Sequence, residues 1–197
     1  MFIYLCPVKP KDEGKIDEIY TATLALVKEQ GLAGITMSQI AKKAGFATGT
    51  VYIYFANKDE LIVKLFDKCI NDYTRDHFAG YDPSAPFKVA FHTIWMNMLR
   101  YSIEHFHEMV FIEQCFHSPF ISEATRKATK DRLLPWRELI ERGKKEKLIK
   151  QVDASWIMLF VRGSVRDLVK HCAYHQLKIT NEFRETMFEM CWDGIRD

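Results

Sequence analysis

Histidine pairs at helical spacing are the first candidates for chemistry in this sequence. His171 and His175 are four residues apart, so on a helix both imidazoles can face one metal ion. Glu104 and His107 form one Glu-x-x-His unit, which is half of the signature of di-iron carboxylate bundles. The second Glu-x-x-His unit is missing. We therefore expect no metal and no cofactor, and interpret His171 and His175 as a solvated or interface pair whose role the sequence leaves open.

Other signatures of enzyme chemistry are also missing. No G-x-S-x-G or P-loop motif appears, and no two cysteines have the C-x-x-C spacing of zinc and redox sites. The scattered cysteines are typical of reduced thiols in a cytoplasmic protein. Residues 1–7 are apolar but lack the basic flank and cleavage site of a signal peptide, and no later run is long enough to span a bilayer. We expect a cytoplasmic protein that is not an enzyme and does not enter a membrane.

The overall charge limits how this chain can bind a polyanion. The formal net charge is +2, although 27% of the residues are charged and 48% are hydrophobic. Such a composition is typical of a globular chain, and the charge is too small for an extensive basic surface. A nucleic-acid partner would have to be bound by locally placed groups.

Helix start signals organise the first third of the chain. Apolar residues follow a helical period from residue 15, and Gly31 is expected to end that helix. Thr36 and Gln39 have the spacing of a capping box, which predicts a short second helix that stops at Gly45. Asn57 and Glu60 form a second capping box at the start of a longer helix that reaches about residue 77.

The clearest break is at residues 79–86, which contain two prolines and a glycine. Beyond it, helical periodicity predicts segments at about 87–116, 122–147 with a kink or split at Pro135, 153–174 and 181–195. The predicted fold class is therefore all-α, with a small N-terminal three-helix unit and a larger C-terminal helical bundle. We place the domain boundary at the break.

Residues 50–55, Thr-Val-Tyr-Ile-Tyr-Phe, have the composition of a strand. Their alternation fits a strand as well as a helix, so periodicity alone does not decide. The rest of the chain offers no second strand to satisfy the backbone of the first. A short helix after a capped helix and a glycine has the layout of a helix-turn-helix, with Val51 and Phe55 facing inward. We therefore expect a helix here.

Three stretches together resemble the DNA-binding domain of the TetR family of transcriptional regulators. They are Ile-Thr-Met-Ser-Gln-Ile-Ala-Lys-Lys-Ala-Gly at 35–45, Thr-Gly-Thr-Val-Tyr-Ile-Tyr-Phe at 48–55 and Asn-Lys-Asp-Glu-Leu at 57–61. The resemblance covers about residues 15–70 and requires many fixed spacings at once. Beyond the break, only the all-helical layout and the total length are similar.

The resemblance implies a dimeric regulator that binds double-stranded DNA and responds to a small effector. It divides the chain into an N-terminal arm at 1–14, a helix-turn-helix domain with its connecting helix at 15–78, and an effector-binding and dimerisation domain at 87–197. The final two helices are expected to form the homodimer. A ligand-responsive repressor of a pseudo-palindromic operator is the expected function, and a helical-bundle enzyme or a scaffold without DNA binding is the alternative.

The family pattern also implies which residues contact DNA. Groove and phosphate contacts are expected from Thr36, Ser38, Thr48, Gly49, Thr50, Tyr52, Tyr54 and Lys58. Hydroxyl groups bond phosphate oxygens without adding charge, and a glycine lets the backbone approach DNA closely. Residues 1–70 contain no arginine, so the motif has no arginine fork for guanine. We expect apolar contacts from Ala47 and Ile53 to thymine methyl groups, together with readout of DNA shape.

The second half of the chain is rich in aromatic residues, methionine and histidine, which a bundle must bury in any case. The family resemblance favours a pocket for a small apolar or aromatic effector. The candidate lining residues are Trp95, Met98, Tyr101, Phe111, Gln114, His117, Trp136, Trp156 and Phe160.

Overall fold

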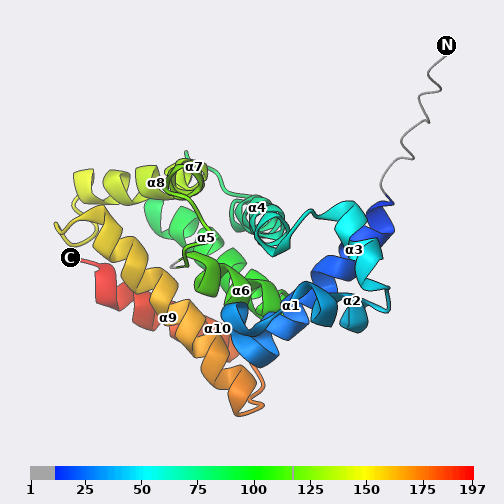
Figure 1. Ribbon diagram of the computed structural model, residues 1–197. Coiled ribbons are helices and arrows are strands. Elements are labelled where there is room, and N and C mark those ends of the chain that lie inside the picture. Colours follow the sequence, from blue (N-terminus) through cyan, green and yellow to red (C-terminus); the bar gives the residue numbers. More distant parts are fainter. Residues whose placement is uncertain (1–11, 117) are drawn as a thin grey trace.

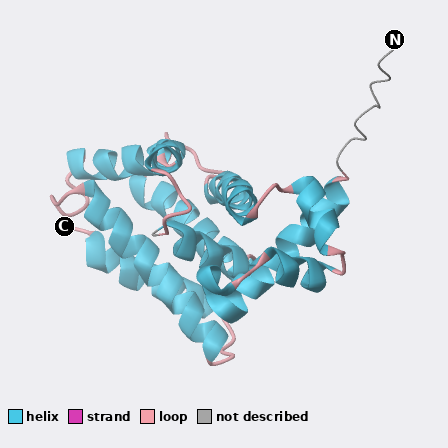
Figure 2. Ribbon diagram, in the orientation of Figure 1, coloured by secondary structure: helices cyan, strands magenta, loops and turns pink. Residues whose placement is uncertain are grey.

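The computed structural model describes residues 12–116 and 118–197, and within these ranges it is all helical (Figures 1 and 2). The helices are α1 (Glu13–Gly34), α2 (Met37–Ala44), α3 (Thr48–Tyr54), α4 (Lys58–His77), α5 (Phe87–Glu104), α6 (Phe106–Phe116), α7 (Glu123–Arg132), α8 (Leu134–Lys145), α9 (Ala154–Tyr174) and α10 (Asn181–Ile195). The predicted all-α class is confirmed. Residues 1–11 of the predicted N-terminal arm lie outside the described residues.

Local signals in the sequence account for the boundaries of α1 to α4. Gly31 has a φ of 75° and interrupts the regular helix, although α1 continues for one more turn beyond it. The Thr36 hydroxyl accepts a hydrogen bond from the backbone N of Gln39, and the Gln39 side chain accepts one from the backbone N of Thr36, which completes the predicted capping box. Gly45 ends α2 with a φ of 77°, a conformation that favours glycine. Asn57 caps α4 as expected, whereas the Glu60 carboxylate accepts from Ala56 instead.

The strand-like hexapeptide lies in α3 except for its last residue, Phe55, which ends the helix. Val51 and Phe55 are buried in a core that α1, α2, α3 and α4 share. Phe111 and Cys115 of α6 belong to the same core. The loop at residues 79–86 is therefore a break in the helices but not in the packing, because α6 completes the core of the N-terminal unit.

A second core joins α5, α8, α9 and α10, with Phe91, Trp95 and Phe188 among its largest side chains. Helix α8 packs closely on α5 because Gly143 has no side chain: a Cβ atom there would lie 2.4 Å from the ring of Phe87. Figure 1 shows α4 between this bundle and the helices α1–α3. Asn97 of α5 donates to the carbonyl oxygens of His77 and Ala79, which fixes the end of α4 against the bundle.

Two predicted helices are each divided in two. The segment at 87–116 breaks at His105, whose φ of −115° and ψ of 43° leave the helical region. No glycine or proline marks this break. His105 instead stacks on Tyr101 and pairs with Glu108, contacts that hold the bend. The segment at 122–147 divides at Leu133, and Pro135 lies in the first turn of α8. Proline is favoured in the first turn of a helix because the N–H group that it lacks would have no partner there.

Candidate nucleic-acid interface and ligand cavity

Helix α3 presents an uncharged surface to solvent. Tyr52 is 51% exposed and Ile53 is exposed further. Gly49 is also exposed, and a Cβ atom added there would meet nothing within 4 Å. Ala47, which precedes the helix, is exposed too, while Thr48 and Thr50 are partly accessible. The surface therefore combines hydroxyl and apolar groups, which suit phosphate oxygens and thymine methyl groups.

Tyr54 lies on the opposite side of α3 from this surface. It is only 8% exposed and belongs to the same core as Val51 and Phe55. These three residues follow the i, i+3, i+4 pattern of a buried helix face, which the sequence already contained. The aromatic side chain that α3 exposes is Tyr52.

The remaining candidate contacts surround α3. Ser38 is exposed in the first turn of α2, and the exposed Thr36 hydroxyl is hydrogen-bonded within its capping box. Lys58 is oriented inward: its Nζ donates to the carbonyl oxygen of Ile35 at 2.8 Å and lies 5.4 Å from the ring centroid of Phe120. The Lys58 side chain thus ties the start of α4 to the α1–α2 junction in the free protein.

A cavity of about 500 Å³ lies among α4, α5, α6, α7, α8 and α9. Its inner wall is apolar and largely buried, with Met98 and Trp136 among its residues. Trp156 and Leu159 of α9 also line it but are exposed. The volume and the mainly apolar wall are those of a site for a small organic ligand.

The structure brings some of the predicted lining residues together and places others elsewhere. Met98, Tyr101, Trp136 and Trp156 line the cavity. The others are distributed as follows: Trp95 and Phe111 are buried in the two cores, Phe160 is exposed on α9, Gln114 accepts a hydrogen bond from the backbone N of Leu32, and His117 lies outside the described residues.

Helix α4 contributes a wall of the cavity that the sequence did not suggest. Ile70, Tyr73 and His77 line it, at positions i, i+3 and i+7 of one helix face. Because α4 begins directly after the helix-turn-helix of α2 and α3, a ligand in the cavity would contact the helix that continues this motif. The sequence predicts a connecting helix here but does not indicate that its Ile70, Tyr73 and His77 side chains line the cavity.

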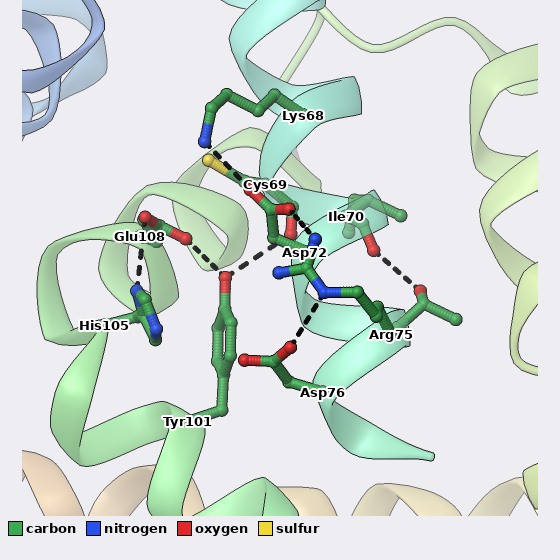
Figure 3. Close-up of polar contacts among 10 residues, drawn as sticks. Lys68, Cys69, Ile70, Asp72, Arg75, Asp76, Tyr101, His105 and Glu108 are labelled. Atoms are coloured by element: carbon green, nitrogen blue, oxygen red, sulfur yellow. Dashed lines mark hydrogen bonds and ion pairs between the residues drawn. The ribbon is translucent and has the colours of Figure 1, made fainter. Parts of the chain in front are cut away.

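Tyr101 connects the cavity wall to α4 and α6 (Figure 3). Its hydroxyl lies 3.4 Å from the carbonyl oxygen of Cys69 and also donates to the Glu108 carboxylate, which pairs with His105 at 3.4 Å. Burial and the nearby Glu108 carboxylate raise the pKa of Tyr101. The phenol therefore stays protonated and keeps donating.

Helix α6 is in turn bonded to α1. Gln114 Oε1 accepts from the backbone N of Leu32 at 2.9 Å, directly after the irregular Gly31, and Lys28 Nζ lies 3.2 Å from His107 Nε2. The helices that surround the cavity thus hold the DNA-reading unit at two places, along α4 and at the end of α1.

The histidine pair is not part of a metal cluster. The rings of His171 and His175 lie 4.4 Å apart, but in the described ranges no three His, Cys, Asp or Glu side chains are grouped to hold a metal ion. Asp167, one turn before His171, is paired with Arg166 at 3.0 Å. Burial raises the pKa of the Cys115 thiol to about 12, so this cysteine is an unreactive thiol. No helix in the described part of the chain is long and apolar enough to cross a membrane.

Comparison with known proteins agrees with this geometry. Residues 19–65 match the family profile "Bacterial regulatory proteins, tetR family", and residues 66–197 match "Tetracyclin repressor-like, C-terminal domain". An HTH-type transcriptional regulator of Haemophilus influenzae is 22% identical over 91% of this chain and 95% of its own. A TetR family regulator from Marinobacter aquaeolei has a TM-score of 0.85 at 23% identity, covering 95% of this chain and 98% of its own. FadR from Bacillus subtilis, solved in complex with stearoyl-CoA, has a TM-score of 0.66 at 17% identity, covering 91% and 98%.

A helix-turn-helix joined to a helical bundle with an internal cavity defines a DNA-binding transcriptional regulator. This chain belongs to the TetR family. The family is one of regulators and not of enzymes, which excludes the alternative of a helical-bundle enzyme or of a scaffold that does not bind DNA.

Proposed function

We propose that this protein is a ligand-responsive repressor that binds a pseudo-palindromic operator as a homodimer in the cytoplasm. The cavity carries the proposal: Ile70, Tyr73 and His77 make α4 both a wall of the cavity and the continuation of the DNA-reading motif. A small apolar or aromatic effector in the cavity would press on the helix that orients α3.

The surface of α9 and α10 supports dimerisation. Trp156 is 68% exposed, and Leu159, Phe160 and Met190 are exposed large apolar residues on the same two helices. Several exposed large apolar residues on two neighbouring helices favour a surface that binds another protein. A two-fold dimer would place its two α3 helices about 34–36 Å apart, one turn of DNA, so that they enter successive major grooves.

The proposed switch is a shift between two dimer geometries. An effector can favour the geometry with poor operator spacing only if it binds that geometry more tightly. Helix α4 and the hydrogen bond from Leu32 to Gln114 are the two connections that would carry the change to α3. The complex of FadR with stearoyl-CoA is a precedent in this fold for a regulator that binds a ligand with a long apolar chain.

Recognition of the operator is proposed to use hydroxyl and apolar contacts. The exposed Ile53 and Ala47 suit thymine methyl groups, and Tyr52, Thr48 and Thr50 suit phosphates. The operator half-sites are therefore expected to be rich in A·T pairs where α3 enters the groove. The missing arginine in residues 1–70 leaves the remaining specificity to DNA shape.

Selection from a random duplex library, followed by gel-shift titration, tests the proposal. We expect an inverted repeat whose half-site centres are separated by about 10 bp or by a multiple of this distance. Affinity should fall with salt in proportion to the number of phosphate contacts, which separates DNA binding from aggregation. A selected site without two-fold symmetry, or half-sites dominated by guanine contacts under α3, would contradict the dimer or the contact chemistry respectively.

A further inference from the structure

The chemistry of the cavity changes from its interior to its opening. The buried residues come mainly from α4 and α5, whereas Lys130, Arg137 and Arg162 are exposed residues of α7, α8 and α9. The opening therefore lies on the side of α7, α8 and α9, and basic side chains surround it. The interior of the cavity is mainly apolar, and its methionine side chains can adapt to the shape of a ligand.

The basic groups at this opening outnumber the acidic groups. Four basic residues and one acidic residue, Glu113, line the cavity. Glu113 is engaged by Arg166 at 3.5 Å and by Lys170. Within the described ranges, Lys130, Arg137 and Arg162 form no ion pair with a carboxylate. The charge of Arg137 acts on the Asp153 carboxylate without a direct contact between the two side chains. The opening therefore has an excess of positive charge, which favours an anionic group.

Arg162 is the residue best placed to bind that group. Its guanidinium carbon lies 5.8 Å from the centroid of the Phe116 ring, which holds the planar group beside the cavity wall. Its charge also acts on Tyr73, where it opposes the increase in pKa that burial causes. Arg162 thus extends from the opening toward the inner wall. A guanidinium group binds carboxylate or phosphate with two parallel hydrogen bonds.

The buried wall of the cavity contains an unpaired polar side chain. His77 is 1% exposed, lines the cavity, and has no hydrogen-bonding protein group for either ring nitrogen among the described residues. The rings of Tyr73, Phe78 and Trp136 surround it at centroid distances of 4.9 to 5.8 Å. A buried polar group without a partner costs free energy, which a ligand hydroxyl or carbonyl group would recover.

We propose that the effector is an amphipathic anion with an apolar body in the cavity interior. A carboxylate or phosphate group at the opening is held by Arg162 together with Arg137 and Lys130. A second, uncharged hydroxyl or carbonyl group forms a hydrogen bond with His77 in the buried wall. This inference rests on the proposed function in one respect only, namely that the cavity is the effector site.

Binding of a matched head-group series tests the anionic part. The protein is titrated with alkanoates, alkanols and alkyltrimethylammonium ions of about 8 to 16 carbons, lengths suited to a cavity of this size class. Tryptophan fluorescence is the signal, because Trp136 and Trp156 line the cavity. The alkanoate should bind about tenfold more tightly than the alkanol, in line with a charge-assisted hydrogen bond, and the ammonium ion most weakly. In the triple variant K130Q/R137Q/R162Q this preference should disappear while alkanol binding is retained. The control is R100Q, because Arg100 is an exposed arginine outside the cavity.

Equal binding of alkanoate and alkanol by the unmodified protein would overturn the proposal, as would a preference that survives in K130Q/R137Q/R162Q. Alkyl phosphate and acyl-coenzyme A arms of the same chain lengths identify the source of the anion. The tightest of the three anions shows whether a free acid, a phosphate ester or a nucleotide thioester is bound.

The His77 contact is tested with ω-hydroxyalkanoates against plain alkanoates. At one chain length the hydroxyl group should improve affinity by about fivefold, the value of one hydrogen bond. The variant H77F, which keeps an aromatic ring in the cage, should lose this improvement. Should H77F fail to fold, ¹⁵N shifts of the His77 ring in the unmodified protein provide the second measurement. A hydroxyl group that neither improves affinity nor moves these shifts at any chain length would overturn the contact.

A gel shift with the selected operator separates this inference from the proposed function. An anion that binds the cavity but leaves operator affinity unchanged supports the ligand class and contradicts the effector role. An uncharged ligand that releases the operator, with no anion bound, supports the effector role and overturns the ligand class.

Discussion

The hydroxyl group of Tyr101 lies 3.4 Å from the carbonyl oxygen of Cys69, so a residue of the cavity wall is hydrogen-bonded to the backbone of α4. The same hydroxyl donates to Glu108 of α6, and Gln114 of α6 accepts a hydrogen bond from Leu32 of α1. A displacement of Tyr101 would therefore reach both helices that lead to the DNA-reading unit. This arrangement makes the hydroxyl group a test of how the two halves of the chain are coupled.

Tyr101→Phe removes the hydroxyl group and keeps the ring. The free energy of unfolding should fall by about 1–2 kcal/mol, because the partly buried Glu108 carboxylate loses a donor. Affinity for the effector should change little, whereas its effect on operator affinity should weaken. Urea unfolding and gel shifts with and without effector measure the two effects. Tyr81→Phe is the matched control, and equal stability of Tyr101→Phe and the unmodified protein would contradict the role of the hydroxyl group.

Gly49→Leu separates DNA binding from folding. A side chain at Gly49 would meet open space in the free protein, so thermal stability should be unchanged or slightly higher, as leucine favours helices. On DNA the same side chain should hold α3 away from the groove and weaken operator binding by about tenfold or more, ~1.4 kcal/mol. Gel shifts and thermal melts are the measurements. Unchanged operator affinity would show that Gly49 does not face DNA.

Gly163→Leu is the corresponding test of the dimer. A Cβ atom added at Gly163 of α9 would likewise meet no atom within 4 Å, so the protomer should fold normally. Gly163 lies one helical turn from Leu159 and Phe160 on the proposed interface. Analytical ultracentrifugation should show a shift from dimer to monomer, and operator affinity should fall with it. Gly49→Leu is the control, since it should weaken DNA binding and leave the dimer intact.

Local sequence signals predicted the helices, and packing decided which faces they cover. Helix α2 begins at the predicted Thr36–Gln39 capping box and ends at Gly45, and a helix break lies beside Pro135. These boundaries were predictable because caps and turns depend on neighbouring residues alone. The break at His105 had no such signal, since contacts with Tyr101 and Glu108 hold it. That break was therefore invisible in the periodicity.

The candidate sites show the same division. Tyr52, Ile53 and Tyr54 were all expected to contact DNA. Tyr52 and Ile53 are exposed on α3, while Tyr54 lies in the core because its flank of α3 is covered. Lys58 was expected at a phosphate, and in the free protein it donates to the carbonyl oxygen of Ile35 across a fold contact that the sequence does not encode locally. His77 was interpreted only as the end of a helix, since its place in the cavity depends on how α4 packs on α8.

The buried His77 should make stability depend on pH. Burial lowers its pKa to about 3, against an ordinary value of 6.5, so the folded protein keeps the ring neutral. Below pH 6.5 the unfolded chain binds a proton that the folded protein does not, so stability falls as the pH falls toward 3. From pH 7 to pH 5 the loss from this one group should be about 2 kcal/mol.

Urea unfolding of the unmodified protein and of His77→Phe at pH 5, 6, 7 and 8 isolates this contribution. The carboxylates and the other histidines titrate in both proteins, so the difference between the two stability curves reports His77 alone. His77→Phe should lose less stability on acidification, by about 2 kcal/mol at pH 5 relative to pH 7. Parallel curves would mean that the ring is protonated in the folded state and is therefore not enclosed as the contacts with Tyr73, Phe78 and Trp136 indicate.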